Sequence, residues 1–153
     1  MSGEERLPKF VGVKMELLRT YSELIRLPTF IQRFEYLRLD GIVGATTFGS
    51  DRYLNQLFYT SEEWRRIRDI VIIRDNGCDL AIDGYDIPNR IVIHHMNPIT
   101  VDDVLKHSAA LIDPEFLVCV SDSTHKAIHY GDAGLLPRGP VERIQNDTCP
   151  WKL

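Results

Sequence analysis

Cysteine and long apolar runs are scarce in this sequence, and each scarcity excludes a class of protein. The three cysteines stand far apart, so they do not form the disulfide framework of a small secreted domain, and a reducing compartment is expected. The apolar runs fall far short of the roughly 20 residues that a membrane helix needs. The first residues, Met-Ser-Gly-Glu-Glu-Arg, lack the basic and apolar regions of a secretory signal. We therefore expect a cytoplasmic protein that does not contact a membrane.

Basic residues are also in short supply. The 153 residues include 18 of Lys and Arg against 22 of Asp and Glu, which gives a net charge of −4. Nonspecific binding to a phosphate backbone normally draws on basic surface, so this balance argues against tight nucleic-acid binding without a bound cation. A local exception is the group Arg65, Arg66 and Arg68, which fits either a solvated helix face or a surface that follows a nucleic-acid backbone.

The length of 153 residues suits one domain, or a compact core with an added helical segment. A content of 44% hydrophobic and 26% charged residues is ordinary for a soluble globular protein. Apolar residues recur at helical spacing from about Lys14 to Leu27, which predicts a first helix, and Thr29 is a candidate cap for a second short helix to Leu39. Ser61 with two following acids marks a further helix that reaches about Arg74. Residues 51–58 fit a helix or irregular chain equally well. Short strands are expected near Asp79–Ile82, Asn89–His95 and Leu117–Val120, with a long loop over Met96–Glu115 in which Thr100 starts a helical segment. The pattern divides the chain into 1–60, a helical extension packing on the core, 61–130, the main domain, and 131–153, a tail without periodicity.

Histidines are the most informative residues that the sequence does contain. Four of the five fall in two clusters: His94 with His95 at the end of an alternating apolar run, and His125 with His129. The second pair lies between a capping serine and a glycine stop, which is typical of a short helix. Residues i and i+4 share one helix face, so both imidazoles can bind one metal ion, and a histidine at a strand end can complete the ligand set. Taken separately, His94 and His95 also fit a strand-end pair hydrogen-bonded to backbone. His125 and His129 also fit a polar helix face.

The order strand, long loop, strand and helix, with histidines at these positions, resembles the ββα-metal arrangement of HNH nucleases. The resemblance runs from about Ser61 to Tyr130. Arg74-Asp-Asn-Gly-Cys78 is similar to the family's lead-in to the first strand, and Phe116 lies nine residues before His125, where the family has the asparagine of its Asn-Leu…His segment. The four-histidine pattern also resembles the nuclease domains of DNase colicins. The resemblance implies an α+β fold, with a ββα-metal (HNH) core, an N-terminal helical segment and an irregular C-terminal tail.

The resemblance also implies a chemistry. Mapped residue by residue, it assigns His94, His125 and His129 to one divalent metal ion, Mg²⁺, Mn²⁺, Ni²⁺ or Zn²⁺, and His95 to the general base. Such an ion neutralises charge on a scissile phosphate and stabilises the leaving oxygen, while histidine suits proton abstraction near neutral pH. The candidate DNA contacts are Lys126, Arg65, Arg66 and Arg68, each of which also fits a solvated surface.

The sequence departs from the family pattern in two places. The motif asparagine is replaced by Phe116, so another group must hold the loop, for which Asn97 is a candidate. We expect Phe116 itself to pack into the core under the long loop. The Cys-x-x-Cys pairs that many members carry are incomplete, because the matching positions hold Ala81, Ser121 and Thr124. A structural four-cysteine zinc site is therefore excluded.

Together these features predict a metal-dependent endonuclease that hydrolyses phosphodiester bonds of double-stranded DNA. Looser similarity of Thr47–Arg52, His94–Pro98 and Asn146–Trp151 to small HNH proteins of tailed bacteriophages implies a phage-encoded protein of the host-cell cytoplasm, linked to genome processing and to terminase or packaging proteins. The alternative is a non-catalytic phage structural or assembly protein that keeps a metal-stabilised HNH-like scaffold. Phe116 and the acidic charge favour this alternative, whereas an intact His95 opposes it. A homing-type nuclease or a toxin is a weaker third interpretation, because the sequence has no obvious added DNA-recognition module or translocation segment.

Overall fold

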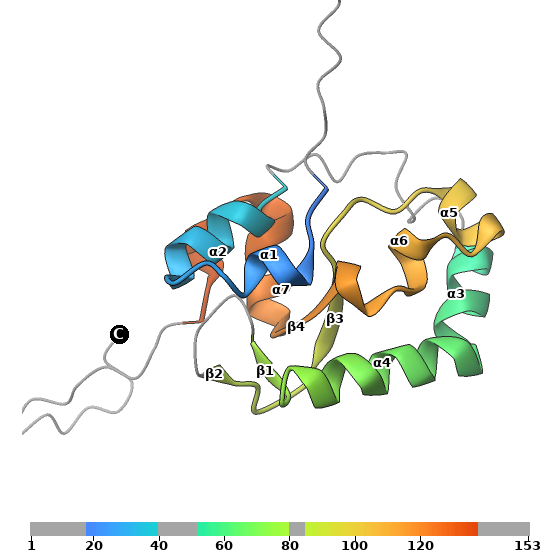
Figure 1. Ribbon diagram of the computed structural model, residues 1–153, viewed down its shortest axis with the longest axis horizontal. Helices are drawn as coiled ribbons and strands as arrows, with labels where there is room; N and C mark the ends of the chain where they lie inside the picture. The colour runs from blue at the N-terminus through green and yellow to red at the C-terminus, as the bar shows by residue number, and fades with distance from the viewer. Residues whose placement is uncertain (1–17, 40–51, 80–84, 138–153) are drawn as a thin grey trace, which may run out of the picture.

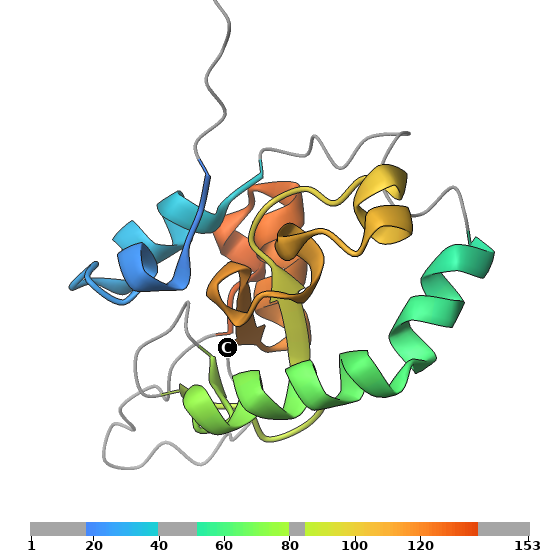
Figure 2. The same cartoon turned by 45° about the vertical axis from the view of Figure 1, so that its right-hand side comes forward.

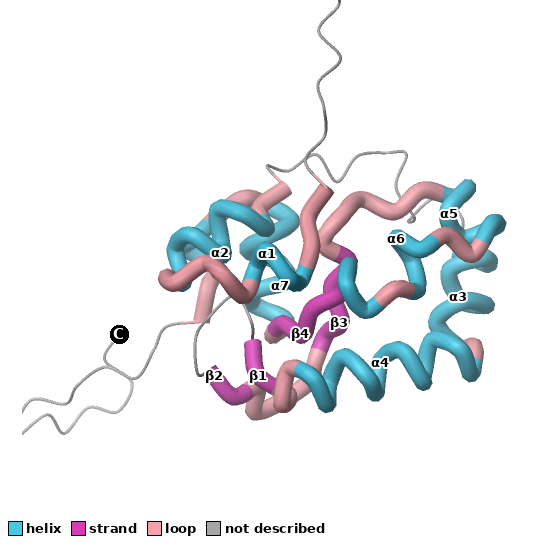
Figure 3. Tube along the Cα trace, viewed as in Figure 1, coloured by secondary structure: helices cyan, strands magenta, loops and turns pink. Residues whose placement is uncertain are grey.

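The computed structural model describes residues 18–39, 52–79 and 85–137 (Figure 1). At its centre β3, Val92–His95, pairs antiparallel with β4, Leu117–Val120. A second two-stranded antiparallel sheet joins β1, Cys78–Asp79, to β2, Tyr85–Asp86. Helices lie on both sides of the β3–β4 sheet, whereas β1 and β2 lie at the edge of the molecule beside the end of α4 (Figure 3). The predicted α+β class is confirmed at this level, as helices mixed with small antiparallel sheets.

Helices make up most of the described chain. α4 starts directly after its Ser61 cap and ends at Arg74, as predicted, and the undecided stretch before it is the helix α3. The expected loop after β3 is largely helical, because Thr100 and Asp103 form a capping box and further turns follow. No helix within the described ranges is long and apolar enough to cross a membrane. The helical bounds are α1 Tyr21–Leu24, α2 Phe30–Leu37, α3 Arg52–Thr60, α4 Glu62–Arg74, α5 Val101–Lys106, α6 Ala109–Ile112, η1 Pro114–Phe116, α7 Asp122–Tyr130 and η2 Ala133–Leu135.

β3 and the first helix are shorter than the sequence predicts. β3 begins three residues later than expected, at Val92, while β4 has the predicted bounds. The strand predicted near Asp79–Ile82 starts at Cys78, and its later residues fall outside the described ranges. The first predicted helix is described only from residue 18, where it amounts to α1. Local pattern therefore located each of these elements and gave the bounds of β4, but it overestimated the lengths of β3 and the first helix.

The β3–β4 sheet separates two hydrophobic cores (Figures 1 and 2). Alternate side chains of a strand point to opposite faces, so Val118 and Val120 pack with one group of helices while Leu117 and Cys119 pack with another. The first group, α1, α2 and α7, contributes Leu24, Phe34, Leu37, Ala127 and Ile128. The second group, α3 to α6, contributes Phe58, Trp64, Ile67, Val71, Val104 and Leu111. The same alternation sends His94 towards α7 and His95 towards α4.

Arg74 and Asp75, at the end of α4, fasten this helix to the sheet. Their side chains form an ion pair in which Nε of Arg74 lies 2.7 Å from Oδ1 of Asp75. The guanidinium also donates to the carbonyls of Pro114 and Leu117, at 2.7 Å each. Asp75 accepts a hydrogen bond of 2.9 Å from the backbone N–H of Cys119. Because these groups are wholly or largely shielded from water, α4 has a defined position against β4.

Candidate metal centre

The centre of the site is a buried imidazole nitrogen without a partner. His94 lies on β3, faces α7 and has 2% of its surface exposed. Its Nε2 is fully buried and has no hydrogen-bond partner among the described residues. Within the described ranges, the other buried side-chain nitrogen without a hydrogen-bond partner is Nδ1 of His129. An unpaired buried polar atom costs free energy, so the unpaired Nε2 of His94, with two more imidazoles beside it, fits a site that a ligand completes.

α7 brings two more imidazoles to His94. Nε2 of His125 lies 3.0 Å from Nε2 of His129, and the two ring centroids lie 5.3 and 5.2 Å from that of His94. One ligand nitrogen from each ring lies within 4.8 Å of the other two. The nitrogen ligands of a single tetrahedral zinc ion stand about 3.3 Å apart, given Zn–N bonds of about 2.0–2.1 Å. The three histidines could therefore hold a metal ion after small side-chain rotations.

The histidines of the cluster are uncharged at neutral pH, and neutral imidazole is the form that binds metal. Burial, together with the neighbouring His125 and His129, holds the pKa of His94 well below its usual 6.5. Burial, assisted by His129, lowers the pKa of His125 to about 4. Burial also lowers the pKa of His129. The site thus offers three neutral nitrogen donors, which suits a cation.

Asp79 fixes the helix that carries two of these donors. Its buried carboxylate accepts hydrogen bonds from the backbone N–H of Ser121, at 3.0 Å, and from the hydroxyl of Thr124, at 2.5 Å. Ser121 caps α7 as predicted, and Gly131 ends the helix in the left-handed region with a φ of 64°. Asp79 thereby links β1 to the first turn of α7 and sets the position of His125. The sequence gives little indication of this role, because Asp79 stands out only as an acidic residue at the start of a predicted strand.

His95 follows His94 in the chain but points to the other face of the sheet. Its ring stacks on that of Trp64, with centroids 5.5 Å apart and planes inclined by 15°, and it packs edge-to-face with Tyr59, whose ring centroid lies 6.5 Å from that of His95. Nε2 of His95 lies 3.1 Å from the carbonyl oxygen of Leu111, which can only accept, so Nε2 carries the proton. Burial lowers the pKa of His95 to about 4, although that hydrogen bond raises it. His95 is therefore a neutral imidazole whose lone pair is on Nδ1.

Asn97 holds the start of the segment after β3, although its partner is the N-terminal part of the chain and not α7. Its Oδ1 accepts from the backbone N–H of Arg19 at 2.8 Å, and its Nδ2 donates to the Arg19 carbonyl at 2.9 Å. The Arg19 guanidinium donates to the carbonyls of Tyr36 and Arg38 at 2.7 and 3.1 Å. The charge of Arg19 also contributes to the lowered pKa of His94. Arg19 is thus a neighbour of the cluster that no local sequence pattern indicates.

Phe116 does not occupy the core position predicted for it. The residue ends η1, is half-buried and belongs to neither of the two core clusters of the described chain. Its backbone makes the connections instead: the carbonyl accepts from the N–H of Met96 and the N–H donates to the carbonyl of Asp113, both at 3.0 Å. The prediction is wrong because Phe116 ends η1 just before β4, and it is the side chain of Leu117, the first residue of β4, that enters the core.

The arginines predicted to contact DNA are not gathered at the histidine cluster. Arg65, Arg66 and Arg68 lie on α4, which packs on the face of the β3–β4 sheet opposite the three histidines. Arg66 pairs with Glu62 at 3.1 Å across one exposed turn. A surface that includes both these arginines and the cluster would have to extend around the sheet.

Two other cations lie closer to the cluster. Lys126 follows His125 on the exposed side of α7, where its ammonium pairs with Asp122 at 2.7 Å. Arg90, which the sequence did not single out, is exposed just before β3, and its charge contributes to the lowered pKa of His125. Lys126 is thus the predicted DNA contact that adjoins the site, and Arg90 is a further candidate.

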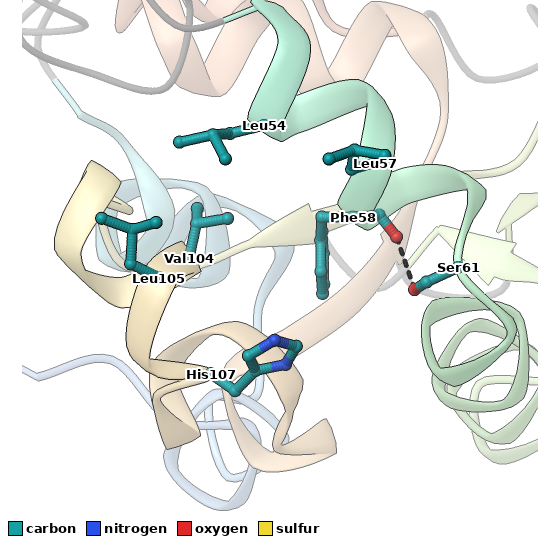
Figure 4. A pocket seen from close by; sticks show the side chains of 7 residues that line it. All are labelled: Leu54, Leu57, Phe58, Ser61, Val104, Leu105 and His107. Carbon is teal, nitrogen blue, oxygen red and sulfur yellow. Dashed lines mark hydrogen bonds between the residues drawn. The ribbon is translucent and has the colours of Figure 1, made fainter.

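A separate shallow hollow of about 230 Å³ lies between α3 and α5 (Figure 4). His107 stands at its edge and pairs with Glu63 at 3.2 Å, so it is an exposed residue away from the cluster. The hollow offers few polar groups and adjoins no cluster of metal-binding side chains within the described chain. Its lining residues are Leu54, Leu57, Phe58, Ser61, Val104, Leu105 and His107.

Comparison of the chain with protein-family models, with curated proteins and with solved structures finds no match.

Proposed function

We propose that this chain is a metal-dependent endonuclease of the HNH type, which hydrolyses phosphodiester bonds of double-stranded DNA. The observation that carries the proposal is the convergence of His94, from β3, with His125 and His129, from α7, around a buried nitrogen that lacks a partner. Three protein ligands leave coordination positions for a substrate phosphate and water, as catalytic metal sites do.

The order of elements around the cluster supports the HNH assignment. β3, the inserted helical segment, β4 and α7 follow one another in the order that a ββα-metal core requires. His94 lies near the end of the first strand, and the other two ligands lie one turn apart on the helix. The pairing of β3 with β4 adds to the histidine spacing, because it places the strand that carries His94 beside the strand that leads into α7.

The donor set bears on the identity of the metal. A divalent ion held by these residues would neutralise charge on the scissile phosphate and stabilise the leaving oxygen. Among the four candidate ions, Zn²⁺ and Ni²⁺ fit better than Mg²⁺ and Mn²⁺, because imidazole suits the former while oxygen ligands suit the latter. We therefore expect Zn²⁺ or Ni²⁺ to bind most tightly.

His95 is the proposed general base. The Leu111 carbonyl holds the proton on Nε2, which leaves Nδ1 able to accept a proton from water. The lowered pKa of His95 keeps this nitrogen unprotonated at neutral pH. A positioned base of this kind contributes about 10²–10⁴-fold to a hydrolytic rate.

The proposed setting follows the resemblance to small phage HNH proteins: the host-cell cytoplasm, with terminase or packaging proteins as partners. Lys126 and Arg90 are the proposed phosphate contacts, because they are the cations beside the cluster. A net charge of −4 implies that DNA binding depends strongly on the bound ion and falls with salt.

One observation favours a second function, a non-catalytic structural or assembly protein stabilised by its metal. The ring of His95 is packed against Trp64 and the carbonyl of Leu111, on the face of the sheet away from the three ligands. A histidine in such a place can also serve only to fill and connect the core. The two functions share the metal site and differ in whether DNA is cut.

The deciding experiment incubates supercoiled plasmid with the purified chain and Zn²⁺, Ni²⁺, Mn²⁺ or Mg²⁺ in turn, with EDTA as the blank. The nuclease proposal requires nicked or linear product with at least one ion, and loss of product for both His125→Ala and His95→Ala. His107→Ala is the matched control, since it removes an exposed histidine outside the cluster. If the parent protein binds one ion per chain but leaves the plasmid supercoiled with each of the four ions, the result favours the structural function instead.

A further inference from the structure

We propose that Trp64 is the positioning residue that holds the imidazole of His95 in its working orientation, an inference that rests on the proposed nuclease function. The rings of Trp64 and His95 stack with centroids 5.5 Å apart and an inclination of 15°. This offset, nearly parallel arrangement is a preferred geometry of aromatic pairs, and it restrains the tilt of the smaller ring. An aliphatic side chain of similar size would fill the space without that preference.

The orientation of a histidine ring needs two restraints. Rotation about its outer side-chain bond has broad minima, so the plane of the ring is set mainly by its surroundings. The Leu111 carbonyl, 3.1 Å from Nε2, selects which edge of the His95 ring faces the core. The indole of Trp64 sets the plane. Together they direct Nδ1, the nitrogen with the lone pair, away from Leu111.

Trp64 is itself held firmly. It lies in the first turn of α4 with 7% of its surface exposed. The hydroxyl of Ser61 donates to the carbonyl of Phe58 at 2.6 Å (Figure 4) and accepts from the N–H of Trp64 at 3.2 Å. The rings of Phe58 and Tyr59, at the end of α3, each lie 5.2 Å from the indole. The corner between α3 and α4 thus fixes the indole, and through it the ring of His95.

A buried tryptophan also fills space, so a matched control must separate positioning from packing. Ile67 lies three residues further along α4 in the same core cluster as Trp64. Ile67→Ala weakens that core from the same helix and leaves the stacked pair intact. Trp64→Leu removes the aromatic face, and Trp64→Phe restores one.

The first measurement is independent of cleavage. Long-range ¹H–¹⁵N spectra of the full chain, with the His95 signals assigned through His95→Gln, report which ring nitrogen carries the proton. We expect the Nε2–H tautomer and ring-to-ring nuclear Overhauser effects to Trp64 in the parent. The same tautomer should dominate in Trp64→Phe and Ile67→Ala, and a mixture of tautomers should appear in Trp64→Leu. A parent in the Nδ1–H form, or without contacts between the two rings, would overturn the proposal even if Trp64→Leu fails to fold.

The second measurement is plasmid cleavage with the preferred ion. Trp64→Leu should lower kcat by about 10²-fold, the usual effect of displacing a catalytic group by about 1 Å, with KM and ion affinity unchanged. Trp64→Phe and Ile67→Ala should keep most of the parent's kcat below their melting temperatures. Equal losses in Trp64→Leu and Ile67→Ala would reduce Trp64 to a core residue. The two proposals can also fail separately. If the parent cuts no DNA, but the Nε2–H tautomer dominates in the parent and in Trp64→Phe and not in Trp64→Leu, the nuclease function is overturned and the positioning role of Trp64 is supported.

Discussion

Nε2 of His125 lies 3.0 Å from Nε2 of His129, one turn further along α7. Both imidazoles are neutral, so at this distance one ring donates its N–H and the other accepts. A metal ion bound by both of these nitrogens needs both lone pairs, and the shared proton must then move to Nδ1. Ion binding and this hydrogen bond therefore exclude each other. The two imidazoles are joined by a hydrogen bond in the metal-free protein, and both would become ligands in the ion-bound protein.

The first prediction concerns the metal site. His125→Ala should weaken Zn²⁺ or Ni²⁺ binding and abolish the rise in melting temperature that the ion causes, because an ion bound only to the folded state stabilises it. That stabilisation amounts to about 2.7 kcal/mol at an ion concentration of 100 times Kd. Calorimetric titration and thermal melts with and without EDTA measure both quantities. His107→Ala should behave like the parent, and a His125→Ala variant with undiminished ion binding would contradict the assignment.

Metal binding and proton transfer should be separable by mutation. His95→Ala should keep the ion, because His95 faces away from the three ligands, while cleavage falls by about 10²–10⁴-fold. Metal content by mass spectrometry and initial rates of plasmid nicking, taken on the same preparation, test the two halves of the prediction. If His95→Ala nicks as fast as the parent, His95 is not the base.

Acid should unfold the metal-free protein within a defined range. The pKa values of His95 and His125 fall to about 4 on folding, from 6.5, and those of His94 and His129 fall as well. As the pH falls, the unfolded chain takes up protons before the folded chain does. The contribution of these histidines to the free energy of unfolding is therefore fully present above pH 6.5 and is lost as the pH drops towards about 4. Urea unfolding in EDTA at a series of pH values should show this decline, and His125→Ala should reduce it. The same free energy of unfolding at neutral pH and at about pH 4.5 would refute the prediction.

Asp79 should be needed for both stability and metal affinity. Asp79→Ala leaves the N–H of Ser121 and the hydroxyl of Thr124 without their buried acceptor, at a cost of about 1–3 kcal/mol. The ion affinity should fall too, because α7 loses its attachment to β1. Denaturant unfolding and ion titration measure the two effects. Asp69→Ala, which removes an exposed acid from α4, should stay within about 0.5 kcal/mol of the parent.

Phe116 should tolerate the asparagine that the HNH motif places there. Its ring is half-buried and outside both core clusters, so Phe116→Asn should cost less than the roughly 1.5–3 kcal/mol of a fully buried aromatic side chain. Leu117→Asn is the matched comparison, because Leu117 is completely buried and an amide there lacks water. Chemical denaturation of both variants should give a clearly larger loss for Leu117→Asn, and equal losses would show that the ring of Phe116 belongs to the core.

Elements with strong local signals were predictable from the sequence. Ser61 caps the start of α4 and Ser121 that of α7, because a serine side chain accepts a hydrogen bond from a backbone N–H two or three residues ahead. Gly131 ends α7 because glycine enters the left-handed region at little cost. The shared face of His125 and His129 follows from helix periodicity alone. Each of these features depends on interactions within about one helical turn.

The partners that complete the site were decided by the tertiary structure. Asp79 reaches Ser121 and Thr124 over 42 and 45 residues, and Asn97 reaches Arg19 over 78. Strand alternation required His94 and His95 to face opposite sides, but only the packing of α7 and α4 on the two faces placed His94 beside two further histidines and His95 beside a tryptophan. Local sequence rules cannot predict such contacts, because whether a buried polar group finds its partner depends on which distant segments the two cores bring together.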